Sequence, residues 1–387
     1  MSFGPRLGPR KPGQCEDIAL AERRRRRPGA LIGAVTAAGL LSGLLVGSAS
    51  ASTATANTAT GGKTLVSAAR CAANQAAGTI TYLTGFGWQA SVGILDPIAA
   101  DALGYYSAMC LRVQLKPGNG DPTSSGQLVA AGRATVTELG SPSDAITAEA
   151  GGIPVDAVAT YGNTTASTLL TKPSVTNLRQ LDGKTIGYKG AMPPIITAML
   201  EKAGVDLHSV KEVSVGYDPT ILPRGQVQAL TAYKSNEPIQ LKDDGYKFHE
   251  WDPGSFGLKG AFNVFDANRA WATAHPGAME DFLRATFEAY RYCLSHASTC
   301  VHEAARYQAG YLVHQNIQRW QLETSEVDGT LIAGHGVGYE DQAQWEPEYK
   351  ILLADHLIKH PVTLATIINP TYIAAVYHGS SLIWPGP

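Results

Sequence analysis

Short blocks of apolar residues recur along the chain from residue 79 onward, separated by polar stretches rich in Gly, Pro, Asn and Asp. Blocks with β-branched and aromatic side chains predict strands, and they are 79–84, 111–115, 136–139, 156–161, 184–188, 212–216, 228–233, 246–251 and 260–267. Two intervening segments, 124–132 and 193–204, have the composition of helices and end at a glycine. Strands that alternate with helices favour parallel sheets covered by helices, so the predicted fold class is α/β.

The pattern changes near residue 275 and becomes almost purely helical. Apolar residues recur at helical spacing over 276–296, 300–312 and 342–358. The chain has 387 residues, more than one ordinary hydrophobic core accommodates, so two domains are expected. We therefore expect two α/β lobes, followed by helices that pack back on one of them.

The composition supports a folded chain and excludes one class of partner. Apolar residues make up 44% and charged residues only 17%, with 41 Gly and 22 Pro, which is typical of an α/β chain with many turns. The net charge of −2 hides an asymmetry, because residues 1–51 carry eight basic and three acidic side chains and the remainder carries 23 and 30. A body with a net charge of −7 lacks the basic face that nucleic-acid binding requires.

The first 51 residues have the three parts of a secretory signal peptide. A run of arginines at 23–27 precedes an uncharged apolar segment at 30–47, and small residues at 49–51 suit cleavage after Ala51. The apolar segment is also just long enough to span a membrane, so an uncleaved anchor is the alternative. Either way, we expect an exported protein that is periplasmic or extracellular and associated with the cell surface.

The small, polar residues 52–77 predict a flexible linker between this leader and the folded part. Four cysteines follow the leader, and in an oxidising compartment an even number predicts disulfides. They allow three pairings; the short spacing favours Cys293 with Cys300, which leaves Cys71 with Cys110, and free buried thiols are the alternative. The residues before Cys71 do not form a lipobox, so a lipid anchor is not supported.

Motifs of enzyme chemistry are missing from the sequence. His302 and Glu303 lack the second histidine of a zinc-binding HExxH motif, since Arg306 stands in its place. The glycine-rich stretch 334–338 lacks the strand-to-helix context of a nucleotide loop, and no nucleophile elbow or P-loop is present. The ten histidines show no metal-ligand spacing. The sequence therefore predicts a protein that is not an enzyme and has neither a cofactor nor a metal.

Small and polar residues follow several predicted strands, at 138–144, 161–167 and 187–194. In open α/β sheets, ligands bind beyond the carboxyl ends of the strands, where helix N-termini offer free backbone N–H groups. Such loops in both lobes predict a ligand cleft between the two domains.

Five stretches carry a family resemblance, and they are 85–106, 120–144, 175–188, 213–241 and 275–290. Together they resemble the type II periplasmic solute-binding proteins of ABC importers, in the branch of sulfonate, nitrate and thiamine-pyrimidine binders. The most recognisable stretch is VTNLRQLDGKTIGY at 175–188. The resemblance covers about 79–380 and is nearest to the pyrimidine binders, although Thr135 and Gln228 stand where the family usually has aspartate.

The resemblance implies a two-lobed fold of mixed sheets flanked by helices, with one lobe formed by 78–168 and 269–387 and the other by 169–268. It implies crossovers near 168–173 and 264–270 that hinge the lobes around a captured small molecule. It also implies a monomer that docks on an ABC permease in the membrane. The implied ligand is a thiamine-precursor aminopyrimidine; the alternatives are an aliphatic sulfonate, nitrate or taurine-like anion, or an exported enzyme or receptor on the same scaffold.

The site residues that the resemblance implies come from both lobes. They are Trp88, which would stack on a flat ring; Glu138 or Ser141, with Asn163 and Thr164, from the first lobe; backbone N–H groups of Gly190 and Ala191; Tyr217 and Glu237 as the wall of the second lobe; and, more remotely, Trp251 and Phe256. Simple packing is the alternative for Trp88 and Tyr217. A carboxylate at Glu237 suits an aminopyrimidine because it accepts hydrogen bonds, whereas Lys189 and Arg224 keep an anionic ligand open.

Overall fold

A computed structural model of the chain describes residues 64–386, which belong to one compact unit. The predicted signal peptide, its predicted cleavage site and residues 52–63 of the proposed linker lie outside the described residues. Within the part that is described, no helix combines the length and the apolar character needed to cross a membrane.

The first lobe is built on a five-stranded sheet with the order β2-β1-β3-β10-β4. Its strands are β1 (Thr79–Leu83), β2 (Arg112–Lys116), β3 (Val136–Leu139), β4 (Ala157–Gly162) and β10 (Phe262–Ala267). Strands β2, β1 and β3 run parallel, and β10 lies antiparallel between β3 and β4. Every residue of β3, β4 and β10 is buried, as expected for strands covered on both faces.

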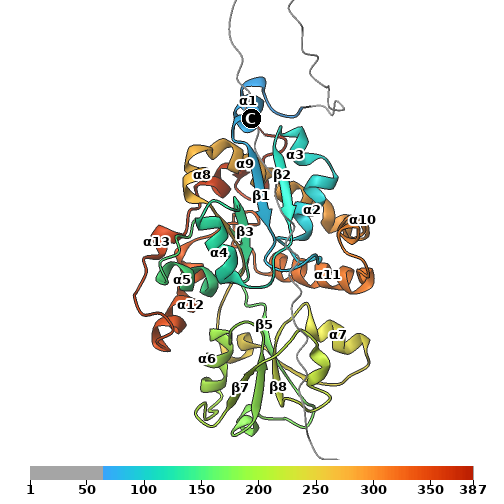
Figure 1. The fold of residues 1–387 in the computed structure, drawn as a ribbon, viewed down its shortest axis with the longest axis vertical. Coiled ribbons are helices and arrows are strands. Elements are labelled where there is room, and N and C mark those ends of the chain that lie inside the picture. The colour runs from blue at the N-terminus through green and yellow to red at the C-terminus, as the bar shows by residue number, and fades with distance from the viewer. Residues whose placement is uncertain (1–63, 387) are drawn as a thin grey trace, which may run out of the picture. The chain divides into compact units, whose positions relative to one another are not determined.

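Helices cover this sheet, and most of them come from the second half of the chain (Figure 1). They are α1 (Ala68–Ala76), α2 (Leu95–Ala102), α3 (Tyr105–Ala108), α4 (Pro122–Ala130), α5 (Pro142–Ala150), α8 (Arg269–Ala274), α9 (Pro276–Ser295), α10 (Ala297–Ala304), α11 (Val313–Gly329), α12 (Gln342–Ala354), α13 (Leu364–Ile367) and α14 (Thr371–Ala375). A small hairpin, β11 (Tyr377–His378) and β12 (Ser381–Leu382), follows α14. Phe282 of α9 packs between the buried rings of Tyr82 and Tyr106, so the predicted C-terminal helices do pack back on the first lobe.

The second lobe repeats the plan with the sheet order β7-β6-β8-β5-β9. Its strands are β5 (Ser167–Thr171), β6 (Thr185–Tyr188), β7 (Lys211–Ser214), β8 (Ala229–Tyr233) and β9 (His249–Trp251), and its helices are α6 (Pro194–Lys202) and α7 (Glu237–Asp243). Strands β7, β6 and β8 run parallel, and β5 is antiparallel to both β8 and β9. The structure therefore has the predicted two mixed sheets flanked by helices.

The expected boundaries of the second lobe are wrong at both ends. β10 hydrogen-bonds to β3 and β4 in the first sheet, and β5 already pairs with β8 from Ser167 onward. The chain therefore crosses between the lobes at 163–166 and again at 257–261, not at 168–173 and 264–270. The alternation of apolar residues reveals a strand, but it does not reveal which sheet the strand joins.

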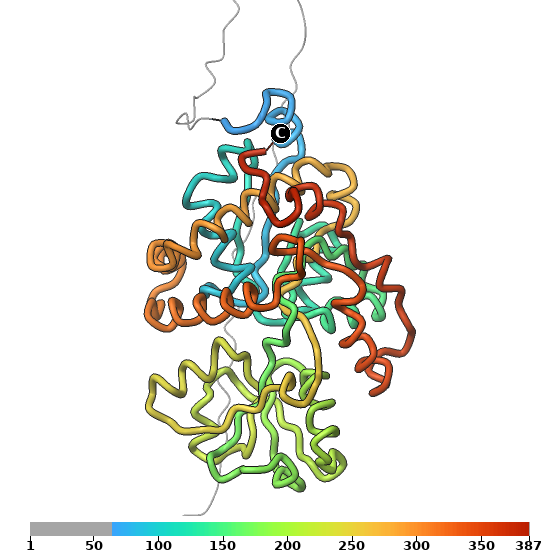
Figure 2. Tube along the Cα trace, turned by 180° about the vertical axis from the view of Figure 1, so that it is seen from behind, coloured from blue at the N-terminus to red at the C-terminus, as the bar shows by residue number. Residues whose placement is uncertain are grey.

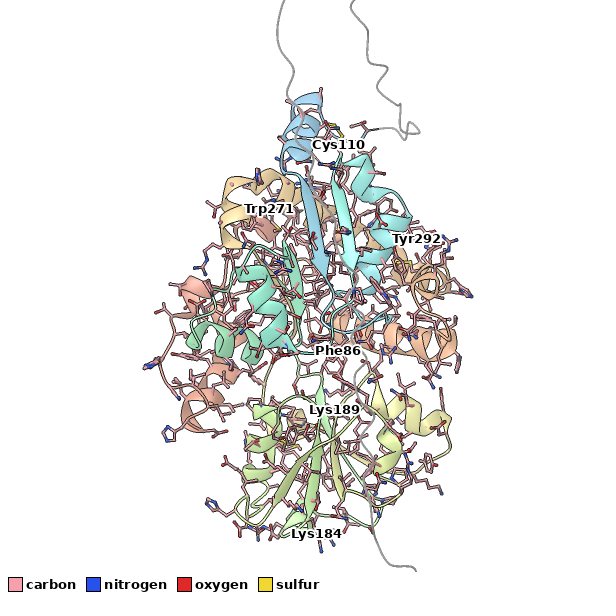
Figure 3. All side chains as sticks on the ribbon, in the orientation of Figure 1. Phe86, Cys110, Lys184, Lys189, Trp271 and Tyr292 are labelled. Atoms are coloured by element: carbon pink, nitrogen blue, oxygen red, sulfur yellow. A yellow bond between two sulfur atoms is a disulfide. The ribbon has the colours of Figure 1, made fainter. Side chains whose placement is uncertain are left out.

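The linker prediction is also wrong for its last residues, because 68–76 form helix α1. Alanine is the strongest helix former, so the alanine-rich residues 68–76 favour a helix, although their small and polar composition is also typical of a linker. Arg70 holds α1 to the start of α9 through ion pairs with Glu280 (2.8 Å) and Asp281 (2.7 Å). A disulfide joins Cys71 of α1 to Cys110, which Figure 3 labels beside α1. The second disulfide joins Cys293 to Cys300, so the structure contains the two pairs that the spacing favours.

Candidate functional site: the interface between the lobes

The two lobes face each other with the carboxyl ends of their parallel strands. Figure 3 places Phe86, just after β1, and Lys189, just after β6, on facing ends of the lobes, whereas Lys184, just before β6, lies at the far end of the second lobe. Helix α11 lies along this edge of the first lobe and contacts α7, and Figures 1 and 2 show the two side by side. The loops after β1 and after β6 therefore lie on the facing ends of the two lobes.

The turn that follows β8 makes direct bonds to the first lobe. Tyr233 donates its hydroxyl hydrogen to Oδ1 of Asn263, at 2.9 Å, and Ser235 donates to Oε1 of Glu323 on α11. Residues 233–236, which we call the interlobe turn, make two further bonds across the interface. Lys234 lies 3.3 Å from Glu326, and Asn236 accepts a hydrogen bond of 2.6 Å from Arg319.

The first-lobe partners of this turn also hold the loop between β1 and α2, residues 84–94. Glu323 accepts the N–H of Val92 through Oε2, at 2.8 Å, and Asn263 donates to the carbonyl of Val92, at 2.7 Å. Asn316 accepts the N–H of Ala90, at 2.8 Å. Glu323 and Asn263 are fully buried, so these bonds are shielded from water.

Three carboxyl groups at the interface are held in a form that resists ionisation. Burial raises the pKa of Glu138 on β3 well above its usual range, and the charges of Glu323, Asp96 and Asp144 raise it further, although a hydrogen bond from Gly85 N–H opposes the shift. Burial raises the pKa of Glu323 to about 7 and that of Asp144 to about 6. A carboxyl group that keeps its proton can both donate and accept a hydrogen bond, whereas its ionised form only accepts and repels a neighbouring anion.

Glu237 has partners within its own lobe. Its Oε1 lies 2.8 Å from Nζ of Lys189, and its Oε2 accepts the N–H of Tyr233, at 2.8 Å. Lys189 also donates to the carbonyl of Thr231, at 2.6 Å. Both carboxylate oxygens are therefore engaged in fixing the interlobe turn to the end of β6, and the side chain is buried.

The other predicted residues of the first lobe lie on the facing loops. Trp88 belongs to the 84–94 loop, is half-buried, and packs against Tyr307 with ring centroids 4.6 Å apart and the ring planes tilted by 41°. Ser141 is the N-cap residue of α5. Asn163 binds the hydroxyl and carbonyl oxygens of Thr330, just after α11, and Thr164 follows it in the first crossover.

Of the second-lobe predictions, Gly190 and Ala191 are exposed on the loop after β6. Tyr217 is 54% exposed and reaches the first lobe, because a Cβ atom on Gly120 would come within 2.6 Å of its hydroxyl oxygen. The same Cβ would meet the ring of Phe86 at 3.1 Å. Tyr217 therefore spans the gap between the lobes at this point.

Trp251 and Phe256 do not join these residues. Strand β9 lies at the edge of the second sheet, where Trp251 donates through Nε1 to Thr171 at the end of β5, 2.9 Å away. Both aromatic rings pack into the second-lobe core on the side of α6. The structure therefore gives them a packing role and not a place at the interface.

Sequence reasoning missed the interface residues on α11 and β10. Asn316, Arg319 and Glu323 lie on a helix that the sequence analysis did not predict, although apolar residues recur at helical spacing from Val313 to Val327. Asn263 is one of two polar residues, with Asp266, inside the buried strand β10, and its polar side chain there is the available signal. Among residues 64–386, no group of three or more His, Cys, Asp or Glu side chains could hold a metal ion.

Comparison with known proteins identifies a family. The family model described as NMT1/THI5 like matches residues 94–299, more than half of the chain. No curated protein has a sequence that matches this chain significantly.

Solved structures with the same fold include binding proteins and an enzyme. The alkanesulfonate-binding protein SsuA of Xanthomonas axonopodis, bound to MOPS, superimposes with a TM-score of 0.59 at 14% identity, covering 75% of this chain and 98% of that one. The aliphatic sulphonate binding protein SsuA of Escherichia coli gives 0.56 at 13% identity, over 80% and 96%. The desulfurization enzyme DszB gives 0.50 at 14% identity, over 76% and 97%. At these identities the likeness establishes the fold.

Proposed function

The chain belongs to the NMT1/THI5-like family, and from this premise we propose that it is the extracytoplasmic solute-binding protein of an ABC importer. Its two lobes meet through polar loops at the ends of parallel strands, which is where open α/β sheets bind ligands. The likeness to sulfonate-binding proteins of the same fold supports a transport role. The partners in this proposal are a small molecule and a membrane permease, and the exported protein acts as a monomer.

The proposed ligand is a small aromatic molecule that donates hydrogen bonds, most simply an aminopyrimidine of the thiamine-precursor type. The observation that carries this choice is a set of carboxyl groups near the interface, the buried Glu138 and Glu323 and the half-buried Asp144, whose pKa values are all raised. An amine can donate to such groups in either protonation state, whereas a sulfonate accepts a hydrogen bond only from a protonated carboxyl group and is repelled by an ionised one. Trp88 on the adjoining loop offers a ring on which a pyrimidine can stack.

One observation favours an anionic ligand as the second candidate. Arg319 is 5% exposed, and its Nε has no partner among the described residues. A buried guanidinium with a free donor suits a sulfonate or carboxylate group. Its two outer nitrogens, however, already donate to Asn316 and Asn236, so only the Nε–H remains for an anion.

An enzyme on the same scaffold is the third candidate, because DszB shares the fold. The four cysteines of residues 64–386 are all joined in disulfides. A thiol nucleophile is therefore missing from the described part of the chain, which weighs against covalent catalysis of that kind.

Thermal-shift measurements with matched ligands test the proposal. We expect a 4-aminopyrimidine to raise the melting temperature, since a ligand at 100 times its Kd stabilises a protein by about 2.7 kcal/mol. Glu138→Gln should weaken this response, whereas Gln226→Glu, on the second lobe away from the interface, should not. Stabilisation by alkanesulfonates or nitrate alone would replace the pyrimidine by an anion, and turnover of any of these compounds would favour the enzyme.

A further inference from the structure

Two buried side chains hold the backbone of Val92 in the 84–94 loop, one through its N–H and the other through its carbonyl. Glu323 accepts its N–H and Asn263 donates to its carbonyl, at 2.8 and 2.7 Å. The second polar atom of each of these side chains bonds to the interlobe turn: Ser235 donates to Glu323, and Tyr233 donates to Asn263. Two separate hydrogen-bonded bridges therefore lead from the second lobe to one backbone position of the first.

Hydrogen bonds and burial hold each of the two bridging side chains, Glu323 and Asn263, in one orientation. Glu323 is fully buried and uses both carboxyl oxygens, one for each lobe. Asn263 is also buried and uses its amide oxygen, its amide nitrogen and its backbone N–H, the last donated to the carbonyl of Gly140 at 3.1 Å. Its φ of 54° lies in the left-handed region, which a non-glycine residue adopts at a cost and keeps only when its surroundings hold it there.

We propose that Glu323 and Asn263 are positioning residues that couple the interlobe turn to the 84–94 loop. When the turn docks, Tyr233 and Ser235 fix the two side chains, and these fix the peptide groups of Val92. When the turn moves away, each side chain loses one of its two anchors, and the loop becomes free to move. Trp88 belongs to the same loop, so contact between the lobes also restrains the segment that carries this ring.

The flanking contacts of the turn are arranged differently. Arg319 donates to Asn236, and Lys234 pairs with both Glu326 and Asp252. Lys234 and Glu326 make no bond to the 84–94 loop, and Arg319 reaches it only indirectly, through Asn316 and Ala90. Tyr233 and Ser235 are therefore the residues of the interlobe turn that a single side chain, Asn263 or Glu323, joins to the 84–94 loop. This difference allows the inference to be tested by substitutions within the turn.

Amide hydrogen exchange on the full chain, without any ligand, tests the coupling. Tyr233→Phe combined with Ser235→Ala removes both bridging hydroxyls and touches neither Val92 nor its loop. We expect amide exchange at Val92 and across 84–94 to accelerate about three- to tenfold, the range that corresponds to the net worth of a buried hydrogen bond. Exchange in β1 should stay unchanged. Tyr233→Phe combined with Ser235→Thr keeps a hydroxyl at position 235. We expect amide exchange in this variant to be as slow as in the single Tyr233→Phe variant.

Matched controls use the same substitutions elsewhere in the second lobe. Ser209→Ala and Tyr246→Phe change exposed residues far from the turn in sequence and should leave the 84–94 loop unchanged. Unchanged exchange at Val92 in the double variant would overturn the proposal, and so would an equal acceleration in β1, which indicates general destabilisation. Ser235→Ala alone, a minimal deletion, decides the question if the double variant does not fold. The effect on solute capture rests on the proposed function, but this measurement does not, so the two can fail separately.

Discussion

Lys189 and Glu237 form an ion pair inside the second lobe, with 2.8 Å between Nζ and Oε1, and both side chains are largely buried. The sequence gives Glu237 the appearance of a ligand residue, since it follows a strand and precedes Pro238. In the structure its carboxylate neutralises Lys189 and accepts the N–H of Tyr233. The first role of Glu237 is therefore to hold the interlobe turn in place.

Replacing Glu237 by glutamine should destabilise the protein in the absence of any ligand. The variant leaves the Lys189 ammonium largely buried without its counter-charge, which costs about 3 kcal/mol for a pair of this kind. Urea denaturation followed by circular dichroism measures the loss. The control is Glu346→Gln, which breaks the exposed pair of Glu346 with Lys350 on α12 and should cost less than about 0.5 kcal/mol. Equal costs in the two variants would contradict a buried, structural pair.

Glu340 should make the protein less stable as the pH rises. Burial raises its pKa from 4.5 to about 8, the charge of Asp156 adds to the shift, and a hydrogen bond from Thr160 opposes it. The folded protein therefore keeps a proton on Glu340 that the unfolded chain has released. The stability that this proton contributes is complete below about pH 4.5 and is lost as the pH rises through 8.

Glu340→Gln isolates this contribution, because glutamine is neutral at every pH. We expect the variant to be somewhat less stable than the wild type at pH 5, since glutamine fits a site shaped for a carboxyl group imperfectly. Between pH 5 and pH 8 the wild type should lose about 3 kcal/mol relative to the variant. Urea midpoints at several pH values measure the difference, and parallel curves for the two proteins would show that Glu340 is ionised in the fold.

Gly120→Ala should destabilise the protein more than Gly132→Ala does. Both glycines have positive φ, +80° and +67°, so alanine is strained at either position by about 1 kcal/mol. At Gly120 the new Cβ would also meet Tyr217 and Phe86, whereas at Gly132 it meets nothing within 4 Å. Adding Tyr217→Ala should recover part of the excess cost, and an additive double-mutant cycle would rule out contact between Tyr217 and Gly120.

The two disulfides should contribute unequally to stability. In the chain-entropy description, the bond between Cys71 and Cys110, which closes a separation of 39 residues, stabilises by about 4 kcal/mol, and the bond between Cys293 and Cys300, with a separation of 7, by about 2.5 kcal/mol. Replacing each pair by two alanines and comparing the denaturation midpoints tests the order. The reverse order would mean that packing around α1 outweighs loop closure.

Periodicity predicts much of this fold because most elements bury a regular apolar pattern. Nine of the ten strands from β1 to β10 and helix α9 were recognisable from their own residues; the exception is β5, whose residues were expected to form part of a crossover between the lobes. Helix α11 was missed because Asn316, Arg319 and Glu323 put polar groups on the face that an isolated helix would make apolar. Those groups bond to the 84–94 loop and to the second lobe, and no local pattern in the sequence reports these distant contacts.

The site shows the same limit. Glu138, Ser141 and Asn163 lie at or just after the ends of strands β3 and β4. This position places them at the edge of the first lobe that faces the second lobe, because the direction of a strand decides at which edge it ends. The position of Glu237 after a strand does not reveal that its carboxylate pairs with Lys189 and is not free to bind a ligand. Nor does position along the chain distinguish Trp251, which packs over its own sheet, from an aromatic residue at the interface. Partners distant in the chain decide both cases.

The position of β10 between β3 and β4 has a consequence for the order of assembly. All strands of the second lobe, β5 to β9, precede β10 in the chain, so they leave the ribosome before the strand that joins the two halves of the first sheet. Domains generally fold as units. The second lobe is therefore complete first, and the lobe that begins the chain is the last to close.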